Sequence, residues 1–414
     1  MAQQRRNSVI IAGLDIGTTK VACAIGQIGA NGLEIIGMGT APNLGVRQGA
    51  VINIDITSEA IQKAKEEAEL MAGQKIAEVW LGVAGSHIQS FDSNGMVAVR
   101  NQEVDKDDVE RVIEAAKAIA IPSDRQVLHV LPTEYKVDAQ SGINDPIGMS
   151  GVRLEASVHI VTGAKSAIQN AIKCTEKVGL RVAGLALQQF ASSLAILSED
   201  EKNLGVCVAD VGGGTCDLIA YSQGAVIFTG VVPVGGQNFS HDIAMGLRTT
   251  QTAAEDLKKK YGCALPDLVG ADETIEVESV GGRQKRVINR LELCEIVEAR
   301  AEETLKLIKE KLDEARLSKR LGSGVVVTGG VSQLTGLTEM GDFIFDVPVR
   351  KGVPINAGGL KDIVKSPVSA TVVGLLLYGA QKHPKQSMGV VERDMRSSAT
   401  SMLNRVKNFF SEAF

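Results

Sequence analysis

Residues 8–27 read SVIIAGLDIGTTKVACAIGQ, and the same pattern returns at residues 203–224 as NLGVCVADVGGGTCDLIAYSQG. Each copy begins as an apolar strand, reaches an aspartate, turns through glycine and small polar residues, and returns as a second apolar strand. Asp15 therefore corresponds to Asp210, and a third apolar strand follows each copy. This internal repeat predicts two related halves, each opening with a β-meander, that face each other across a cleft.

The rest of the chain is typical of an α/β protein with more than one hydrophobic core. It has 414 residues, of which 44% are hydrophobic and 22% charged, so it carries too little charge for a disordered chain. Amphipathic helices are expected between the strands at 58–72, capped by Ser58, at 105–120 and at 289–317. A net charge of −5 and 3% aromatic residues argue against nucleic acid as a partner.

Cysteine spacing and apolar run lengths give expectations about compartment. The six cysteines form no CxxC pair and no cluster with histidine, so neither a zinc site nor a disulfide framework is predicted, and a reducing compartment is expected. His87, His129 and His159 are interpreted as structural or exposed rather than as metal ligands. No apolar run reaches the ~20 residues needed to cross a bilayer, and none near the start resembles a signal peptide.

The two repeated turns have the composition of a phosphate site. Backbone N–H groups in turns of small residues can approach phosphate oxygens closely. Asp15 and Asp210 are suited to hold Mg²⁺ through its retained waters, and Lys20 offers a positive charge to the phosphates. The expected cradle residues are Gly17, Thr18, Thr19, Lys20, Gly212, Gly213, Gly214 and Thr215. The alternative is that each aspartate merely begins a hairpin turn.

A third glycine turn follows a fully apolar strand, in VVVTGGVSQLTGL at residues 325–337. Gly329 and Gly330 stand where the strand ends, and a residue without a side chain can lie flat under an adenine ring. This pair of glycines is weak evidence by itself.

In this order and spacing, the three motifs resemble the two phosphate motifs and the adenosine motif of the actin-like ATPase superfamily. The resemblance implies ATP and Mg²⁺ as cofactors. It also implies inter-lobe connecting helices at 185–197 and 369–379, and an AExxK motif whose Glu255 and Lys258 approach the ribose and adenine. Gln188 stands where relatives carry a Glu or Gln that orients the attacking water, so Gln188 and Asp210 are the candidate catalytic residues.

Within the superfamily, nearly the whole chain resembles the FtsA family of bacterial cell-division proteins, through NLGVRQGAVINIDITSEAI (43–61) and VWLGVAGSHIQSF (79–91) among other segments. The resemblance implies a first lobe at 8–84 and 164–198, an inserted subdomain at 85–163, a second lobe at 199–380 with an outer subdomain at about 246–300, a linker at 381–397 and a tail helix at 398–414. It also implies self-assembly into filaments, binding to the C-terminal peptide of FtsZ and to later division proteins, and a place on the cytoplasmic face of the inner membrane at the septum.

The tail can also be argued from its own pattern. On a helix, one face would carry its apolar side chains, and Arg405 and Lys407 would border that face, where they can reach lipid headgroups. The side chains expected to enter or contact the membrane are Leu403, Arg405, Val406, Lys407, Phe409, Phe410 and Phe414. The alternative is a helix that docks on the protein's own core.

The remaining expectations concern partners and rivals. The basic run at 283–290 is either a solvated face or, as the family resemblance implies, the surface that receives the acidic FtsZ peptide, with Arg286 and Arg290 as contacts. ATP would then serve as a conformational switch, with at most weak hydrolysis and no phosphoryl acceptor. The rival functions are a pilus-assembly protein and a sugar or carboxylate kinase of the same superfamily.

Overall fold

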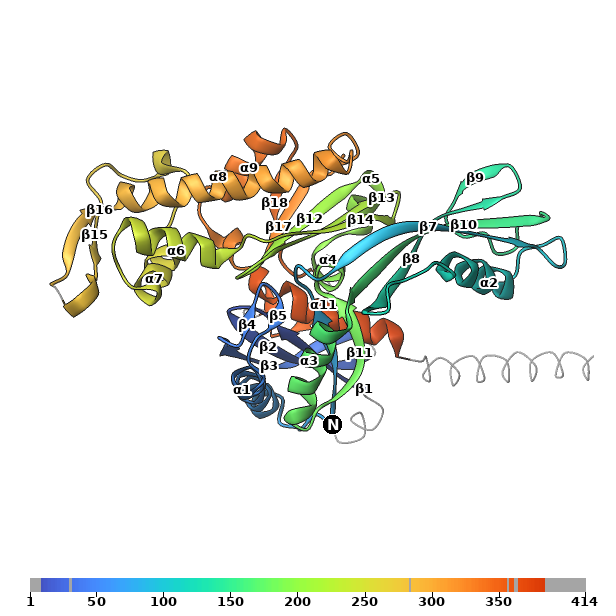
Figure 1. Cartoon of the computed structure of the whole chain (residues 1–414), viewed down its shortest axis with the longest axis horizontal. Helices are drawn as coiled ribbons and strands as arrows, with labels where there is room; N and C mark the ends of the chain where they lie inside the picture. Colours follow the sequence, from blue (N-terminus) through green and yellow to red (C-terminus); the bar gives the residue numbers. More distant parts are fainter. Residues whose placement is uncertain (1–8, 30–31, 283, 356, 361–363, 384–414) are drawn as a thin grey trace, which may run out of the picture.

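A computed structural model describes residues 9–29, 32–282, 284–355, 357–360 and 364–383. Figure 1 shows an elongated α/β molecule in which two lobes meet near the middle of the long axis. A four-stranded subdomain extends from one end of the long axis, and the α6, α7, β15 and β16 region forms the other end. None of the described helices combines the length and hydropathy needed to cross a membrane.

The predicted repeat is confirmed by the strand pairing. In the first lobe β1 (Val9–Ile16), β2 (Lys20–Gly29) and β3 (Gly32–Pro42) pair in antiparallel order, as do β12 (Val206–Val211), β13 (Cys216–Ser222) and β14 (Ala225–Val232) in the second lobe. Each meander is then extended by parallel strands on the outer side of its first strand. The two sheets thus share one design.

The first lobe places its helices against the sheet β11-β6-β1-β2-β3-β19. Its other elements are β4 (Val46–Arg47), β5 (Ala50–Val51), α1 (Ile54–Ala72), β6 (Glu78–Val83), α3 (Lys165–Lys177), β11 (Arg181–Leu187) and β19 (Gly358–Gly359). A core of buried aliphatic side chains joins β1 and β2 to α1 and α3.

The second lobe is built on the sheet β14-β13-β12-β17-β18, and α8 runs along its length in Figure 1. Its other elements are α5 (Glu199–Leu204), α6 (Gly236–Gly246), α7 (Gln251–Tyr261), β15 (Thr274–Val277), β16 (Arg286–Asn289), α8 (Arg290–Glu314), β17 (Val325–Thr328), α9 (Leu337–Phe345) and β18 (Val349–Lys351). Short 3-10 turns occur at Pro266–Leu268, Val280–Gly282, Val331–Gln333 and Pro367–Ser369.

The inserted subdomain leaves the first lobe after β6 and returns at α3. It is an antiparallel sheet, ordered β7-β10-β8-β9, with one helix packed on it. The elements are β7 (Gln89–Ala98), α2 (Lys106–Lys117), β8 (Arg125–Val137), β9 (Gln140–Ile143) and β10 (Arg153–Ala164).

The two connecting helices, α4 (Gln188–Ile196) and α11 (Ala370–Lys382), pack together between the lobes. A side chain at Gly374 would lie 1.8 Å from the carbonyl oxygen of Ala191, so the close helix crossing requires glycine there. Beside the crossing, Trp80 contacts Tyr378 edge to face, with ring centroids 5.3 Å apart. The inserted subdomain joins this aromatic cluster through His129, which also contacts Phe190.

The predicted helix starts need two corrections. The first connecting helix begins at Gln188 rather than at residue 185, because Leu185 to Leu187 still belong to strand β11. Helix α1 begins at Ile54 rather than at Ser58, because the Asn53 side chain caps it by accepting from the Ile56 amide. Ser58 lies inside the helix and is buried. The first turn was missed because Ile54 and Ile56 are partly exposed there, 37% and 42%, so they break the apolar pattern.

Candidate functional site

The two repeated turns lie directly against each other. In the first turn Gly17 N–H donates to the Lys20 carbonyl, and in the second Gly212 N–H donates to the Thr215 carbonyl, at 3.0 and 2.9 Å. A Cβ at Gly213 would lie 2.5 Å from Thr19, and one at Gly214 would lie 2.8 Å from the Thr18 hydroxyl. Only glycine therefore fits where the lobes meet, and the predicted pairing of the two cradles is present.

The carboxyl groups of Asp15 and Asp210 lie beside these turns. Asp15 is 6% exposed and its Oδ1 atom has no hydrogen-bond partner, and burial raises its pKa to about 6. Asp210 accepts from the hydroxyls of Ser192 and Thr371 at 2.7 and 3.2 Å, and burial raises its pKa as well. The charge of Asp210 also raises the pKa of Asp15, so the two carboxyl groups belong to one electrostatic site.

Lys20, the last residue of the first turn, places a positive charge beside Asp15 and Asp210. Its ammonium group donates to the Val368 carbonyl at 2.7 Å, just before α11. Burial lowers the pKa of Lys20, while Asp15 and Asp210 act in the opposite direction. The side chain thus links the first turn to the second connecting helix near both carboxylates.

The third glycine turn reaches the same sheet edge, because β17 runs parallel to β12 and pairs Thr328 with Asp210. Gly329 has a φ of +81°, and a Cβ there would lie 2.6 Å from the Asp210 carboxyl oxygen. At Gly330 a Cβ would meet no atom within 4 Å. The turn therefore presents bare backbone to open space.

Glu255 and Lys258 form an ion pair of 2.6 Å on α7. The Lys258 ammonium group also donates to the Gly236 carbonyl at 2.9 Å, and Gly236 N–H donates to the Gly212 carbonyl at the same distance. This pair of hydrogen bonds connects α7 with the second phosphate turn. Lys258, and Glu255 through it, are therefore linked to the second turn, while their predicted approach to ribose and adenine stays a prediction.

Gln188 is the first residue of α4 and follows the last residue of β11. Strands β1, β6 and β11 are parallel neighbours, so their carboxyl ends, and with them Asp15 and Gln188, lie along one sheet edge. The Gln188 side chain packs over Gly82, where a Cβ would lie 3.0 Å from its Cγ.

These residues fit a nucleotide with a hydrated magnesium ion. Glycine turns allow a phosphate to approach the backbone closely, and the unpartnered Asp15 oxygen is an acceptor available to metal-bound water. No group of three or more His, Cys, Asp or Glu side chains suited to direct metal ligation occurs in the described part of the chain. Indirect contact through water requires no such group.

Three residues of the site escaped the sequence prediction: Ser192, Thr371 and Asp217. Asp217 lies in the quoted motif, is 6% exposed, and accepts from the Thr215 hydroxyl at 2.9 Å, while its Oδ1 atom has no partner. Burial and then Asp210 raise its pKa to about 7. Asp217 lies directly opposite Asp210 across the β12–β13 hairpin, and this pairing was a usable signal for it, whereas the two hydroxyls arrive from connecting helices.

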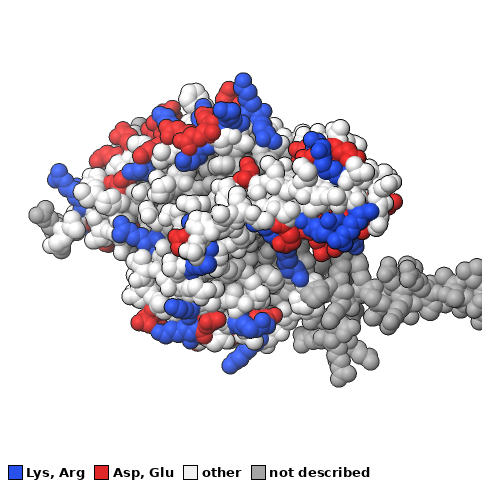
Figure 2. All heavy atoms as spheres, turned by 45° about the vertical axis from the view of Figure 1, so that its right-hand side comes forward, with Lys and Arg blue, Asp and Glu red and all other residues white. Residues whose placement is uncertain are grey.

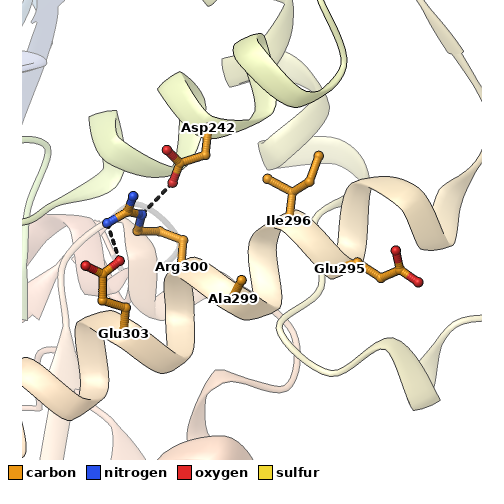
Figure 3. Close-up of a pocket in the computed structure, with 6 residues that line it drawn as sticks. All are labelled: Asp242, Glu295, Ile296, Ala299, Arg300 and Glu303. Carbon is orange, nitrogen blue, oxygen red and sulfur yellow. Dashed lines mark hydrogen bonds and ion pairs between the residues drawn. The ribbon is translucent and has the colours of Figure 1, made fainter.

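The predicted basic contacts are engaged within the fold. Arg290 pairs with Glu273 at 2.7 Å and donates to the Tyr261 carbonyl, and Arg286 donates to the Leu247 carbonyl. A shallow pocket of about 460 Å³ lies nearby between α6 and α8. In Figure 3 its one cation, Arg300, points between Asp242 and Glu303, to which it is ion-paired.

Charge elsewhere on the surface is mixed. On the face in Figure 2, acidic and basic side chains are interspersed, and no continuous basic surface is visible. The predicted linker at 381–397 is described only as far as His383, where α11 has just ended, and the membrane-facing residues from Leu403 to Phe414 lie outside the described residues. The three histidines, interpreted as structural or exposed, are all at least partly buried.

Comparison with known proteins decides the family. The model of the family described as "Cell division protein FtsA" matches residues 207–374, and that of "SHS2 domain inserted in FTSA" matches residues 85–162. Proteins named cell division protein FtsA are 48% identical in Pseudomonas aeruginosa, over 90% of both chains, and 43% identical in Neisseria meningitidis, over the full length of both. The chain belongs to the FtsA family of cell-division proteins. The Escherichia coli member is 39% identical over 98% of both chains.

Solved structures agree with this family and confirm the actin-like ATPase fold. The chain superposes on the PilM-PilN type IV pilus biogenesis complex with a TM-score of 0.63 at 16% identity, covering 89% of this chain and 98% of that chain. MreB5 of Spiroplasma citri, solved with ADP, gives a TM-score of 0.51 at 13% identity, covering 92% of this chain and 98% of the other. At these identities the likeness shows the fold alone, whereas the matches to the FtsA model and to its inserted SHS2 domain identify the family.

Proposed function

We propose that this member of the family binds ATP with Mg²⁺ between its lobes and uses it as a conformational switch in cell division. The observation that carries the proposal is the contact of two glycine turns from duplicated meanders, with Asp15, Asp210 and Lys20 gathered around them. The ADP in the MreB5 structure, a protein of the same fold, supports it.

The chemistry of the site follows from its residues. Backbone N–H groups of the two turns would hold the phosphates, and Mg²⁺, when bound, would supply positive charge to them. Ser192 and Thr371 fix the orientation of the Asp210 carboxylate through one of its oxygens. Gln188 would hold a water near the terminal phosphate, and no phosphoryl acceptor other than water is proposed.

The proposed role also includes attachment and assembly. The tail helix would bind lipid at the cytoplasmic face of the inner membrane, and the second lobe would receive the acidic C-terminal peptide of FtsZ. ATP-promoted filaments of this chain would then hold the FtsZ ring to the membrane and recruit later division proteins. The family assignment supports this role through the division proteins it groups together.

The test is nucleotide binding by calorimetry on full-length variants. Asp210→Ala removes a carboxylate on the magnesium side, and Gly213→Arg fills the cradle against Thr19, so both are expected to abolish measurable ATP binding. Gly29→Arg is the control, because a side chain at this exposed end of β2 meets no atom within 4 Å. Wild-type affinity in both site variants would refute the assignment.

A further inference from the structure

One side chain of the inserted subdomain hydrogen-bonds the backbone at the start of the first connecting helix. The Nε2 atom of His129, on β8, accepts a hydrogen bond of 2.9 Å from the backbone N–H of Leu187. Leu187 is the last residue of β11 and the residue before Gln188, which begins α4. A residue of the inserted subdomain therefore fixes the backbone immediately beside the candidate water-orienting side chain.

The surroundings of His129 favour a fixed, neutral ring. The side chain is 6% exposed and lies between Phe190 and Tyr378, with ring centroids 5.3 and 5.8 Å away. Burial lowers the pKa of His129 to about 4, so the ring is neutral at neutral pH, and the N–H donated by Leu187 leaves the ring proton on Nδ1. No side chain caps the start of α4, and His129 satisfies the backbone N–H of Leu187, the residue at its N-cap position.

We infer that His129 is a positioning residue for Gln188, through which the inserted subdomain sets the geometry of ATP hydrolysis. This inference rests on the proposed function, because it requires ATP in the cleft. The Leu187 N–H is buried, and a buried donor without an acceptor costs free energy. Without His129 the turn into α4 would rearrange to satisfy that donor, and Gln188 would move with it.

A small displacement of Gln188 is sufficient to slow hydrolysis. Reacting groups must be held within a fraction of an ångström for efficient transfer, so a shift of Gln188 lowers the rate of the chemical step. ATP affinity depends on the two turns and the Gly329 backbone, which His129 does not contact. Loss of the His129 hydrogen bond should therefore lower kcat without weakening ATP binding.

The experiment compares His129→Phe and His129→Gln in the full-length protein. Phenylalanine keeps a ring between Phe190 and Tyr378 but removes the acceptor, whereas glutamine loses the ring and can offer a side-chain oxygen at similar reach. For His129→Phe we expect kcat for ATP hydrolysis to fall about tenfold or more while the Kd for ATP stays within a fewfold. His129→Gln is expected to recover most of the rate.

His159→Phe is the matched control. This residue is a second buried histidine of the same sheet, but its ring bonds Asp92 and Thr229 at 2.8 and 2.9 Å and so docks the subdomain on β14 rather than on α4. Equal loss of kcat in His159→Phe would overturn the inference by showing a general effect of docking. Hydrogen exchange at the Leu187 amide, faster in His129→Phe only, checks that the hydrogen bond was removed in a folded protein.

The remaining outcomes are also decisive. Unchanged kcat in His129→Phe, with faster exchange at Leu187, would overturn the positioning role. Wild-type protein that binds ATP without measurable hydrolysis would overturn it as well, while leaving the proposed binding function in place. Wild-type protein that binds no ATP would instead refute the proposed function itself.

Discussion

Three buried carboxyl groups make the site sensitive to protons and cations. The pKa of Asp15 is raised to about 6 and that of Asp217 to about 7, and burial raises the pKa of Asp210. Each group is therefore more protonated in the folded chain than in the unfolded chain over part of the acidic range. In the absence of a bound metal cation, deprotonation of these carboxyl groups lowers the free energy of unfolding.

This sensitivity is testable at Asp217, which is not proposed as a direct magnesium ligand. The pKa of Asp217 in the folded chain, about 7, lies above its ordinary value of 3.8. The contribution of this group to stability is therefore fully present below pH 3.8 and is lost as the pH rises through about 7. Asparagine cannot titrate. We therefore expect Asp217→Asn to gain stability relative to wild type as pH rises across this window, by up to a few kcal/mol.

Urea unfolding in chelator at several pH values would measure the effect. Asp272→Asn, at an exposed carboxyl group in the turn before β15, is the control. Parallel stability curves for Asp217→Asn and wild type would contradict the prediction.

At this scale, prediction from sequence succeeded where the signal is local. The turn residues from Gly17 to Lys20 repeat as a contiguous pattern, so their meeting followed from the symmetry of the two halves. Ser192 and Thr371 reach Asp210 from helices 179 positions apart in the chain, and no local pattern marks them. Their role emerges only from packing.

Among the elements, α7, β16 and the start of α8 carry the partner-binding prediction. The guanidinium of Arg290 is already paired with Glu273, and the nearby pocket in Figure 3 combines Arg300 with three carboxylates. An acidic peptide would meet net negative charge in that pocket. Charge therefore favours the strip formed by Arg286 and Arg290 as its contact.

The peptide prediction follows. Arg286→Glu and Arg290→Glu are each expected to raise the Kd for an acidic FtsZ tail peptide severalfold, and wild-type binding should weaken as salt is added. Fluorescence anisotropy would measure both effects. Lys63→Glu is the control, because this exposed, ion-paired lysine lies on α1 of the other lobe. A loss confined to Arg300→Glu would place the contact in the pocket instead.

Element boundaries show why some predictions failed. The long helix is predicted at 289–317 and is found at Arg290–Glu314. Asn289 is the residue that caps its start, and the helix ends before the cap residue Ala315. The start of α1 was placed too late, because partly exposed isoleucines mask its first turn. Periodicity identifies the packed part of a helix and not its solvated end.

For the whole molecule, the order of lobes and insertion was predictable, because it follows from the repeat and from the family resemblance. Figure 1 places the inserted subdomain and the outer part of the second lobe at opposite ends of the long axis. The docking of the insertion on both lobes, through His129 and His159, was not predictable, since it depends on contacts between residues distant in sequence.

The proposed membrane attachment belongs to this scale, because it would depend on many copies acting together. One tail would bury a few apolar side chains at ~1.5–3 kcal/mol for each one fully buried, less the cost of ordering the helix, so a monomer would bind lipid reversibly. A filament presenting many tails would bind far more tightly. ATP-promoted assembly would thus control attachment.

We expect Phe409→Glu to release the protein from liposomes without loss of ATP binding. Wild-type attachment should rise steeply with ATP and with protein concentration in co-sedimentation. Asn408→Glu, on the polar side of the expected helix, adds the same charge and is the control. Attachment independent of ATP and protein concentration would contradict this mechanism.

Trp80 can serve as a built-in fluorescent reporter. It is the single tryptophan of the chain, and it lies against Tyr378 in the cluster that joins the first lobe, both connecting helices and the inserted subdomain. Intrinsic emission selected for indole therefore arises from one known place, where these parts meet. The rearrangement proposed to follow nucleotide binding would be measured there in real time, by quenching or spectral shift, in the unlabelled native protein.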